Sequence, residues 1–217
     1  MSKKYTKNDF EKRSWEEYAK IMEKILKDVQ KYITKNKIKI DAVVPILRGG
    51  NILGTFLAYR LHLLRILPVQ YKYFFIGKNE AELRQILFTI KKDMFKDNPT
   101  FLLVEGDQCF GNTVITAVKD IKKIFPKAKI LHVADCLDYS YRNSVKDYVE
   151  KIFYGEYTNH CEELSAEKCK ELGIGKASMA PWENYEEEIA TVSGKQFQYG
   201  DGKIVEKQSI KKQEFKF

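Results

Sequence analysis

The stretch that decides the fold, residues 100–118, reads TFLLVEGDQCFGNTVITAV. Four apolar residues, FLLV, run into an acidic residue, Glu105, and a short polar loop then closes on GNT at 111–113. An apolar-periodic segment follows and extends to about residue 125. This order predicts a buried strand at 101–104, a loop, and a helix that begins near Thr113.

A helix that begins directly after a glycine is a natural anion site. Its first backbone N–H groups have no partner within the helix, and the positive end of the helix dipole points the same way. Gly111, Asn112 and Thr113 would supply that site, although an ordinary helix start has the same pattern. Glu105, at the end of the preceding strand, can accept hydrogen bonds from hydroxyl groups. A ligand with both hydroxyls and a phosphate, such as a sugar phosphate, fits this combination.

A second stretch, residues 41–60, repeats this organisation and reads DAVVPILRGGNILGTFLAYR. The apolar run 42–47 predicts another buried strand, and a helix is expected from about Asn51 to about residue 64. Between them lies a tight turn made of Arg48, Gly49 and Gly50. Glycine lets backbone N–H groups approach an anion closely, and a guanidinium adds a forked positive charge. The turn is a second candidate phosphate loop, or simply a tight strand-to-helix connection.

These stretches resemble the motifs of class I phosphoribosyltransferases of the purine-salvage type. In that family a hydrophobic strand, two adjacent acidic residues, a short loop and a Thr-Gly-x-Thr turn hold the ribose hydroxyls and 5-phosphate of phosphoribosyl pyrophosphate (PRPP). The corresponding segment here is VEGDQCFGNT at 104–113, and the Arg48 turn resembles the family's pyrophosphate loop. SWEE at 14–17 resembles the start of the family's N-terminal helix, and APWE at 180–183 resembles the Pro-Trp-acidic motif of its C-terminal hood.

The resemblance implies a Mg²⁺-dependent enzyme that transfers the phosphoribosyl group of PRPP to a nitrogenous, purine-type base and releases pyrophosphate. PRPP would be bound by the two loops and the strand-end acid: Arg48, Gly49, Gly50, Glu105, Gly111, Asn112 and Thr113. Glu105 and Glu183 would face the metal ion, which prefers oxygen ligands. The base would meet three residues, Asp135, Tyr139 and Trp182, for two of which aromatic packing is the alternative role. Family precedent also implies a homodimer or larger homo-oligomer.

The loop departs from the family pattern at three positions, Gly106, Cys109 and Phe110. The family has there a second acidic residue, a later acid that often serves as general base, and a threonine. Asp107 lies nearby and would replace the missing acid if the loop is reshaped, so Asp107 and Glu105 are the candidate catalytic residues. A non-catalytic sensor of PRPP or nucleotides on the same fold is the alternative function.

The composition limits the number of domains, the cellular location and the class of partner that we expect. The chain has 217 residues, 44% of them hydrophobic, which is enough for one α/β domain with a core and a small appendage. Apolar runs are too short to span a membrane, the N-terminus lacks a signal-peptide core, and the four cysteines lack zinc-type spacing. A cytoplasmic location without membrane binding is therefore expected. The net charge of +8 suits an anionic substrate; nucleic acid is the competing partner, but acidic residues separate the lysines.

Further patterns complete an α/β fold with a mainly parallel sheet flanked by helices, of the Rossmann-type phosphoribosyltransferase kind. A helix over 14–33 begins with a capping box of Ser14 and Glu17, and a short helix is expected at 165–172. Additional strands are predicted at 69–76, 86–90, 129–134 and 148–154, with loops at 77–84 and 91–99 and a hairpin at 194–210.

The pattern of elements changes near residue 158. Residues 1–157 would form the core with its N-terminal helix, and residues 158–217 would form a hood, the hairpin and a basic tail. His160 and Cys161 stand next to each other just after this boundary, but no motif surrounds them. They are interpreted as incidental.

Overall fold

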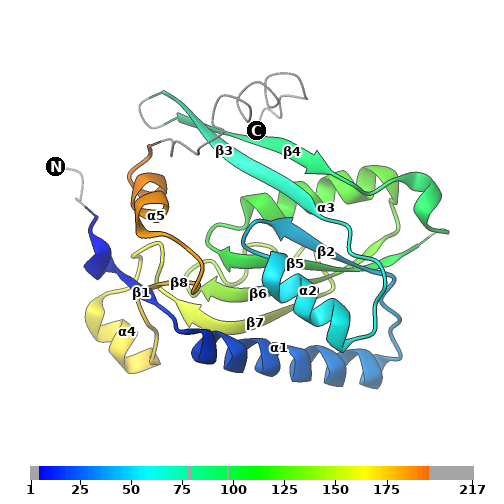
Figure 1. The fold of residues 1–217 in the computed structure, drawn as a ribbon, viewed down its shortest axis with the longest axis horizontal. Helices are drawn as coiled ribbons and strands as arrows, with labels where there is room; N and C mark the ends of the chain where they lie inside the picture. Colours follow the sequence, from blue (N-terminus) through cyan, green and yellow to red (C-terminus); the bar gives the residue numbers. More distant parts are fainter. Residues whose placement is uncertain (1–4, 78–79, 97, 196–217) are drawn as a thin grey trace.

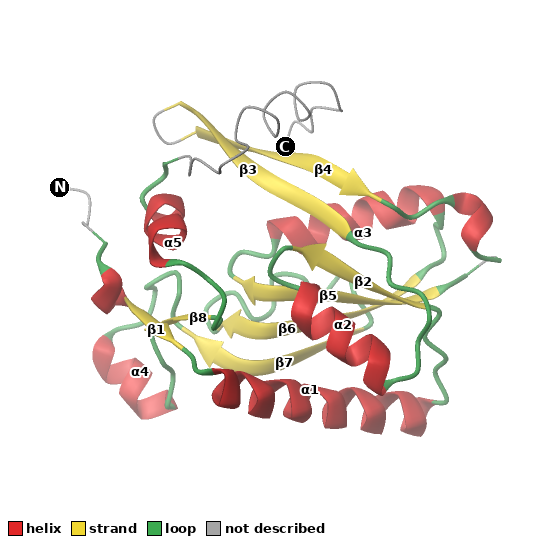
Figure 2. Cartoon of the chain, viewed as in Figure 1, coloured by secondary structure: helices red, strands yellow, loops and turns green. Residues whose placement is uncertain are grey.

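The computed structural model describes residues 5–77, 80–96 and 98–195, and within these ranges a six-stranded sheet forms the centre of the molecule (Figure 1 and Figure 2). Its strands, in spatial order, are β4 (Glu80–Phe88), β3 (Val69–Gly77), β2 (Ala42–Leu47), β5 (Thr100–Gln108), β6 (Lys129–Asp138) and β7 (Lys151–Thr158). Neighbouring strands are parallel except β3 and β4, which form an antiparallel hairpin. The predicted α/β class with a mainly parallel sheet is confirmed.

Helices cover both faces of this sheet, which explains why its central strands are apolar without alternation. In β5, Leu102 and Val104 belong to the core cluster formed with α1 (Trp15–Asn36) and α2 (Asn51–Arg60). Phe101 and Leu103 belong to the cluster formed with α3 (Asn112–Ile124) on the other face. Successive side chains of a strand point to opposite faces, so a strand covered on both sides reads as one continuous hydrophobic run.

The capping box predicted at the start of α1 is confirmed. The backbone N–H of Glu17 donates to the Ser14 hydroxyl at 3.2 Å, and the backbone N–H of Ser14 donates to the Glu17 carboxylate at 2.7 Å. These two bonds satisfy N–H groups that no helical carbonyl can reach. The helix then buries one apolar stripe against the sheet, made of Tyr18, Ile25, Leu26 and Val29.

The chain order places a topological switch point between β2 and β5. From β2 the chain moves outward to β3 and β4, and it then returns to the other side of β2 and continues through β5, β6 and β7. The loops that follow β2 and β5, residues 48–50 and 109–111, therefore leave the sheet at neighbouring positions of its carboxyl edge. Ligands of open α/β sheets bind in the crevice at such a point.

A small second layer, residues 159–195, lies at this carboxyl edge and is called the hood below (Figure 1). It contains α4 (Ala166–Leu172), β8 (Ala177–Met179) and α5 (Tyr185–Val192). β8 pairs in parallel with β1 (Phe10–Lys12), so a segment near the other end of the chain joins the hood. α4 confirms the short helix predicted there, with Ser165 at its N-cap and Gly173 at its C-cap.

Several predicted boundaries inside the sheet are wrong. The predicted loop at 77–84 belongs largely to β4, which begins at Glu80 and pairs with β3. β4 is an edge strand whose polar side chains pair with each other, Arg84 donating to Glu82 at 2.7 Å, so its sequence lacks a strong apolar signal. β5 and β6 run beyond their predicted ends, to Gln108 and Asp138, and β7 spans Lys151–Thr158 rather than 148–154.

The acidic run after Trp182 forms the first turn of α5, a helix that the sequence pattern did not predict. Asn184 caps this helix by accepting from the N–H groups of Glu186 and Glu187 at 2.8 and 3.0 Å. Acidic side chains are favourable at that end of a helix. The hairpin predicted at 194–210 lies, from residue 196 onward, outside the described residues. In the described part of the chain, none of the helices is both long and apolar enough to cross a membrane.

Candidate functional site

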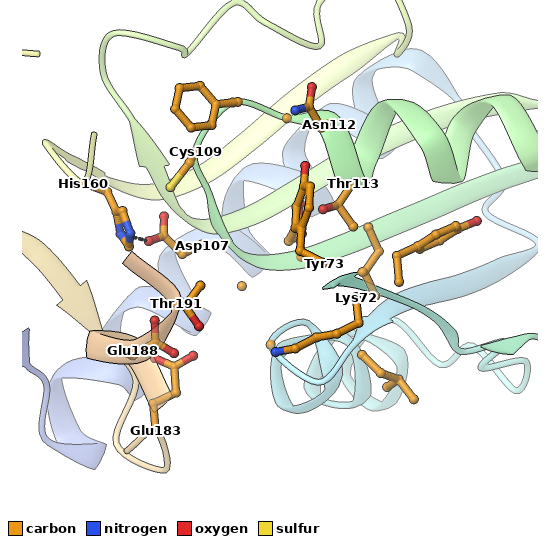
Figure 3. A pocket seen from close by; sticks show the side chains of 18 of the residues that line it. Lys72, Tyr73, Asp107, Cys109, Asn112, Thr113, His160, Glu183, Glu188 and Thr191 are labelled. Atoms are coloured by element: carbon orange, nitrogen blue, oxygen red, sulfur yellow. Dashed lines mark ion pairs between the residues drawn. The ribbon is translucent and has the colours of Figure 1, made fainter. Parts of the chain in front are cut away.

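A cavity of about 330 Å³ opens at the switch point, between the carboxyl edge of the sheet and the hood (Figure 3). Its floor consists of the ends of β2, β3 and β5 and the start of α3. The hood supplies the opposite wall through His160, Glu183, Glu188 and Thr191. The cavity brings together the residues predicted for the sugar phosphate and for acid–base chemistry: Glu105, Asp107, Gly111, Asn112 and Thr113.

Close backbone contacts favour glycine at two positions of the floor, Gly50 and Gly106. A Cβ atom on Gly106 would lie 3.1 Å from the backbone of Gly49, and one on Gly50 would lie 2.8 Å from the carbonyl carbon of Val104. Gly106 stands where the phosphoribosyltransferase pattern has its second acid. In this protein the end of β5 packs against the turn at Gly49 at that position, so the backbone of Gly49 would have to shift by a few tenths of an ångström to admit a side chain.

The start of α3 has the geometry of an anion-binding helix terminus. Gly111 precedes the helix with φ of 84°, a left-handed conformation that favours glycine, and a Cβ atom there would lie 2.5 Å from Cγ1 of Val145. Glycine has no side chain that could cap the helix, so the first N–H groups remain available to a bound anion. Asn112 and Thr113 line the cavity directly.

Half-buried carboxylates gather in the cavity opposite this helix start. Burial, together with the charges of Asp107 and Asp135, raises the pKa of Glu105 to about 8. Burial and the neighbouring Glu188 raise the pKa of Glu183 to about 8 as well. Figure 3 shows Glu183 and Glu188 next to each other in the hood. Acids held this close are stabilised either by protons or by a bound cation.

Asp107 contacts the hood instead of lying in a reshaped loop. Because β5 continues to Gln108, Asp107 belongs to the strand, and its Oδ2 lies 2.6 Å from Nδ1 of His160 (Figure 3). Burial disfavours the charged form of His160, but the Asp107 carboxylate outweighs this effect and raises the pKa of the imidazole to about 9. The two side chains therefore form an ion pair at neutral pH.

A second cavity of about 570 Å³ adjoins the first and shares Gly49 and Lys72 with it. Two residues of the predicted pyrophosphate turn, Arg48 and Gly49, line the second cavity, whereas Gly50 lines neither cavity; the Leu47–Arg48 peptide bond is cis. Arg48 forms an ion pair with Glu187 of α5, and Nζ of Lys72 lies 3.4 Å from the same carboxylate. Two cations thus stand beside the glycine turn, which suits an anionic ligand group.

Of the three predicted base-binding residues, Trp182 lines the second cavity. It also packs edge-on against Tyr18 of α1, with the ring centroids 4.7 Å apart, and its ring is tilted against that of Trp15, with the centroids 5.6 Å apart. Both of its predicted roles, packing of the hood and lining of a ligand site, are compatible with this position.

Asp135 and Tyr139 line neither of these two cavities. Asp135 is buried, with Oδ2 3.9 Å from Nη1 of Arg13, and Tyr139 packs edge-on against Tyr157 at 5.1 Å. For Asp135 the physical reason is the length of β6. This strand runs to Asp138, so Asp135 lies within it rather than at its carboxyl end.

His160, Lys72 and Glu188 are cavity residues that the sequence analysis missed. β7 ends at Thr158, so His160 lies just after the carboxyl end of a strand. The predicted strand ended at residue 154, which placed His160 six residues beyond the strand end. The loop is fixed because the N–H of Cys161 donates to the carboxylate of Asp138 at 2.7 Å. A correct end for β7 was the one signal that would have identified His160.

The sequence matches no protein-family model and has no significant similarity to a curated protein. Solved structures do resemble the fold. The purine phosphoribosyltransferase of Pyrococcus horikoshii matches with a TM-score of 0.57 and 15% identity, over 82% of this chain and 96% of that one. The xanthine-guanine-hypoxanthine phosphoribosyltransferase of Helicobacter pylori matches with a TM-score of 0.56 and 16% identity, over 84% and 99%.

A third similar structure is a hypothetical protein from Neisseria gonorrhoeae with bound ppGpp, with a TM-score of 0.59 and 13% identity, over 84% of this chain and 96% of that one. At such low identity these similarities show the fold. The chain has the type I phosphoribosyltransferase fold, as its motifs predicted.

Proposed function

We propose that this protein is a Mg²⁺-dependent phosphoribosyltransferase that transfers the 5-phosphoribosyl group of PRPP to a nitrogenous, purine-type base and releases pyrophosphate. One observation carries the proposal: at the switch point of this fold, the start of α3 and the acidic end of β5 line the same cavity. Backbone N–H groups for a phosphate, beside carboxylates for hydroxyls, match a sugar phosphate. The two phosphoribosyltransferases with the same fold support this choice.

The anionic ends of PRPP would occupy the two loops. The 5-phosphate would bind at Gly111, Asn112 and Thr113, through the first N–H groups of α3 together with the side-chain amide of Asn112 and the hydroxyl of Thr113. The pyrophosphate would bind in the adjoining cavity, at the turn of Arg48, Gly49 and Gly50. Lys72 lines both cavities and would neutralise charge between the two ends.

The ribose and the metal ion would lie between these ends. Glu105 would accept a hydrogen bond from a ribose hydroxyl, and Glu105 and Glu183 would hold Mg²⁺. The donor set fits a hard cation, because it consists of carboxylate oxygens whose pKa values are raised by burial and by neighbouring acids. When bound, the ion supplies positive charge to the pyrophosphate oxygens.

The reaction breaks the bond between the anomeric carbon and a pyrophosphate oxygen and forms a bond from that carbon to a nitrogen of the base. The proton on that nitrogen must leave, and we assign its acceptance to Asp107, which His160 holds in place. Most of the catalysis would come from positioning and charge stabilisation. Asp107→Asn should lower kcat roughly 10²–10⁴-fold, the usual contribution of a general base.

The test is a pyrophosphate-release assay with PRPP, Mg²⁺ and a panel of purine and pyrimidine bases. The proposal predicts turnover with at least one base, and its loss when Asn112 and Thr113 are both changed to Ala. A matched control changes Thr34 and Asn36 to Ala, the same residue types at the far end of α1, and should keep full activity. Absence of pyrophosphate release with every base would contradict the enzymatic proposal.

A nucleotide- or PRPP-sensing regulator on the same fold is the second candidate. Two observations favour it: Gly106 and Cys109 replace acids of the enzyme pattern, and one protein of the same fold was solved with bound ppGpp. Binding of PRPP or ppGpp to the same cavity without any turnover would select this alternative.

A further inference from the structure

Three side chains of different chemistry converge where the first cavity meets the hood. Asp107, Cys109 and His160 each offer one donor atom, and these atoms all lie within 4.8 Å of one another. Figure 3 shows the three side chains pointing toward a common region, with the Asp107–His160 ion pair drawn as a dashed line. All three residues line the cavity.

The sheet holds this cluster in place. Asp107 lies in β5, Cys109 follows its end, and His160 follows the end of β7. The loop that carries His160 is tied to β6, because the carboxylate of Asp138 accepts the N–H of Cys161 at 2.7 Å. The donors are therefore held by three adjacent strands and not by a long surface loop.

The polar atoms of the cluster are shielded but incompletely satisfied. Both oxygens of Asp107 and Nδ1 of His160 are closed off from solvent, and none of them makes a well-directed hydrogen bond to another described residue. The contact between Oδ2 of Asp107 and Nδ1 of His160, 2.6 Å long, is thus an ion pair without hydrogen-bond geometry. Buried polar atoms without directed partners are costly, and a bound cation would satisfy one oxygen of Asp107 and a ring nitrogen of His160 together.

We propose that Asp107, Cys109 and His160 form a binding site for a divalent transition-metal ion of the zinc class. A thiolate, an imidazole and a carboxylate are the ligands that zinc takes in proteins, whereas Mg²⁺ prefers oxygen ligands alone. The site is therefore distinct from the Mg²⁺ site assigned to Glu105 and Glu183. Three protein ligands leave one tetrahedral position for water or a cavity ligand, the arrangement of zinc sites that are open to a substrate.

The Asp107–His160 pair requires only a small adjustment to bind one ion. Zinc binds nitrogen and oxygen ligands at about 2.0–2.2 Å, so two such ligands of a tetrahedral ion lie about 3.4 Å apart. The 2.6 Å between His160 and Asp107 would open by less than an ångström, a shift that a side-chain rotation can provide.

Metal binding would change the role of Asp107. A coordinated carboxylate cannot also accept the proton of an incoming base, so the metal-bound and transfer-competent forms would exclude each other. The site itself rests on three side chains and not on PRPP binding, and it can be tested without PRPP.

Cobalt(II) titration of the full-length protein tests the site, because a thiolate bound to Co²⁺ gives a charge-transfer band in the near ultraviolet. The wild-type protein should bind one equivalent with this band and with the visible spectrum of tetrahedral cobalt, and Zn²⁺ should displace it. Cys109→Ser should abolish the charge-transfer band. Cys161→Ser is the matched control, since this thiol adjoins Cys109 but lies outside the group of three, and it should keep the band.

His160→Gln should weaken cobalt binding by at least about 10-fold, the scale on which even supporting groups of metal sites act. A second measurement needs no variant: Zn²⁺ should protect Cys109 from alkylation in the wild-type protein, as read by peptide mapping. Either a wild-type spectrum without a thiolate band, or a band that persists in Cys109→Ser and is lost in Cys161→Ser, would overturn the proposal.

Discussion

The two walls of the cavity are built in different ways. The floor, at the ends of β2 and β5, is shaped by backbone: Gly49, Gly50, Gly106 and Gly111 allow loops and strand ends to approach closely. The hood contributes charged side chains on α5 and on the loops before it: His160, Glu183, Glu187 and Glu188. We therefore expect the floor to bind an anion through the N–H groups and side chains at the start of α3, and the hood to add charged groups on the opposite side.

The largest expected effect is on the free energy of unfolding, when a glycine of the floor, Gly50, and a glycine of the hood, Gly173, are each replaced by alanine. A Cβ atom on Gly50 would meet the backbone of Val104 and Ile46, which cannot move without disturbing β2 and β5. Gly50→Ala should therefore lower the free energy of unfolding by roughly 3 kcal/mol or more. Gly173 ends α4 with φ of 64°, and a Cβ atom added there would meet no atom of the described residues within 4 Å. Gly173→Ala should cost about 1–2 kcal/mol, the strain of the left-handed conformation alone.

Urea unfolding monitored by circular dichroism measures both changes. If Gly173→Ala costs as much as Gly50→Ala, the distinction between a backbone-packed floor and a more open hood is wrong.

Replacing Gly106 by the acidic residue of the phosphoribosyltransferase pattern should not strengthen PRPP binding. Gly106→Asp would place a Cβ atom 3.1 Å from the backbone of Gly49, so we expect a loss of stability of roughly 1–2 kcal/mol and weaker PRPP binding. Gly106→Ala isolates the steric part and should lose nearly as much stability. Tighter PRPP binding by the Asp variant, measured by calorimetry, would show that packing does not explain the glycine.

The buried charges predict that the free protein loses stability as the pH rises from 6.5 to 9. Glu105 and Glu183 have pKa values of about 8 in the folded chain, and His160 has a pKa of about 9. All three hold protons more tightly when folded than when unfolded. Raising the pH therefore removes protons from the folded state selectively and lowers the free energy of unfolding.

Urea unfolding at three pH values across this window gives the slope. Glu183→Gln keeps the acceptor for the N–H of Ala180 but removes the titration, so it should flatten the curve. A stability that rises with pH, or an unchanged slope in this variant, would mean that the acids are not held as the structure shows.

The smallest effect should come from the hood's contact with the pyrophosphate turn. Glu187 pairs with Arg48 and Lys72, so it competes with an incoming anion for both cations. Glu187→Gln should change the free energy of unfolding by about 1 kcal/mol, because its main partner, Arg48, is largely exposed. Pyrophosphate affinity should rise a few-fold by calorimetry. Glu186→Gln, on the same turn but lining neither cavity, should leave the affinity unchanged.

The elements that form the floor of the cavity could be predicted from the sequence better than the residues that other strands bring to it. The floor follows from local signals: an apolar run, a glycine and a helix start determine β5 and α3, and Gly111 takes the left-handed conformation that its place before a helix requires. The strand β2 was predicted at its observed bounds, and the motifs of the resemblance led to the correct fold.

Other parts of the site could not be predicted as well, because their geometry depends on where distant strands end and on contacts between distant residues. Asp135 was expected at a strand end but lies inside β6, and His160 was set aside although β7 delivers it to the cavity. Likewise, the reason for Gly106 is its contact with Gly49, a residue more than fifty positions earlier in the chain. Each of these is a tertiary effect that no local pattern contains.

The central claim is that the start of α3 and the acids of the cavity bind a sugar phosphate. Isothermal titration calorimetry of PRPP with Mg²⁺ tests it most directly, using the wild-type protein, Asn112→Ala with Thr113→Ala, and the α1 control with Thr34→Ala and Asn36→Ala. We predict Mg²⁺-dependent binding at a single site that is lost in the α3 variant and kept in the control. Absence of PRPP binding to the wild-type protein, or equal binding by all three, would contradict the claim.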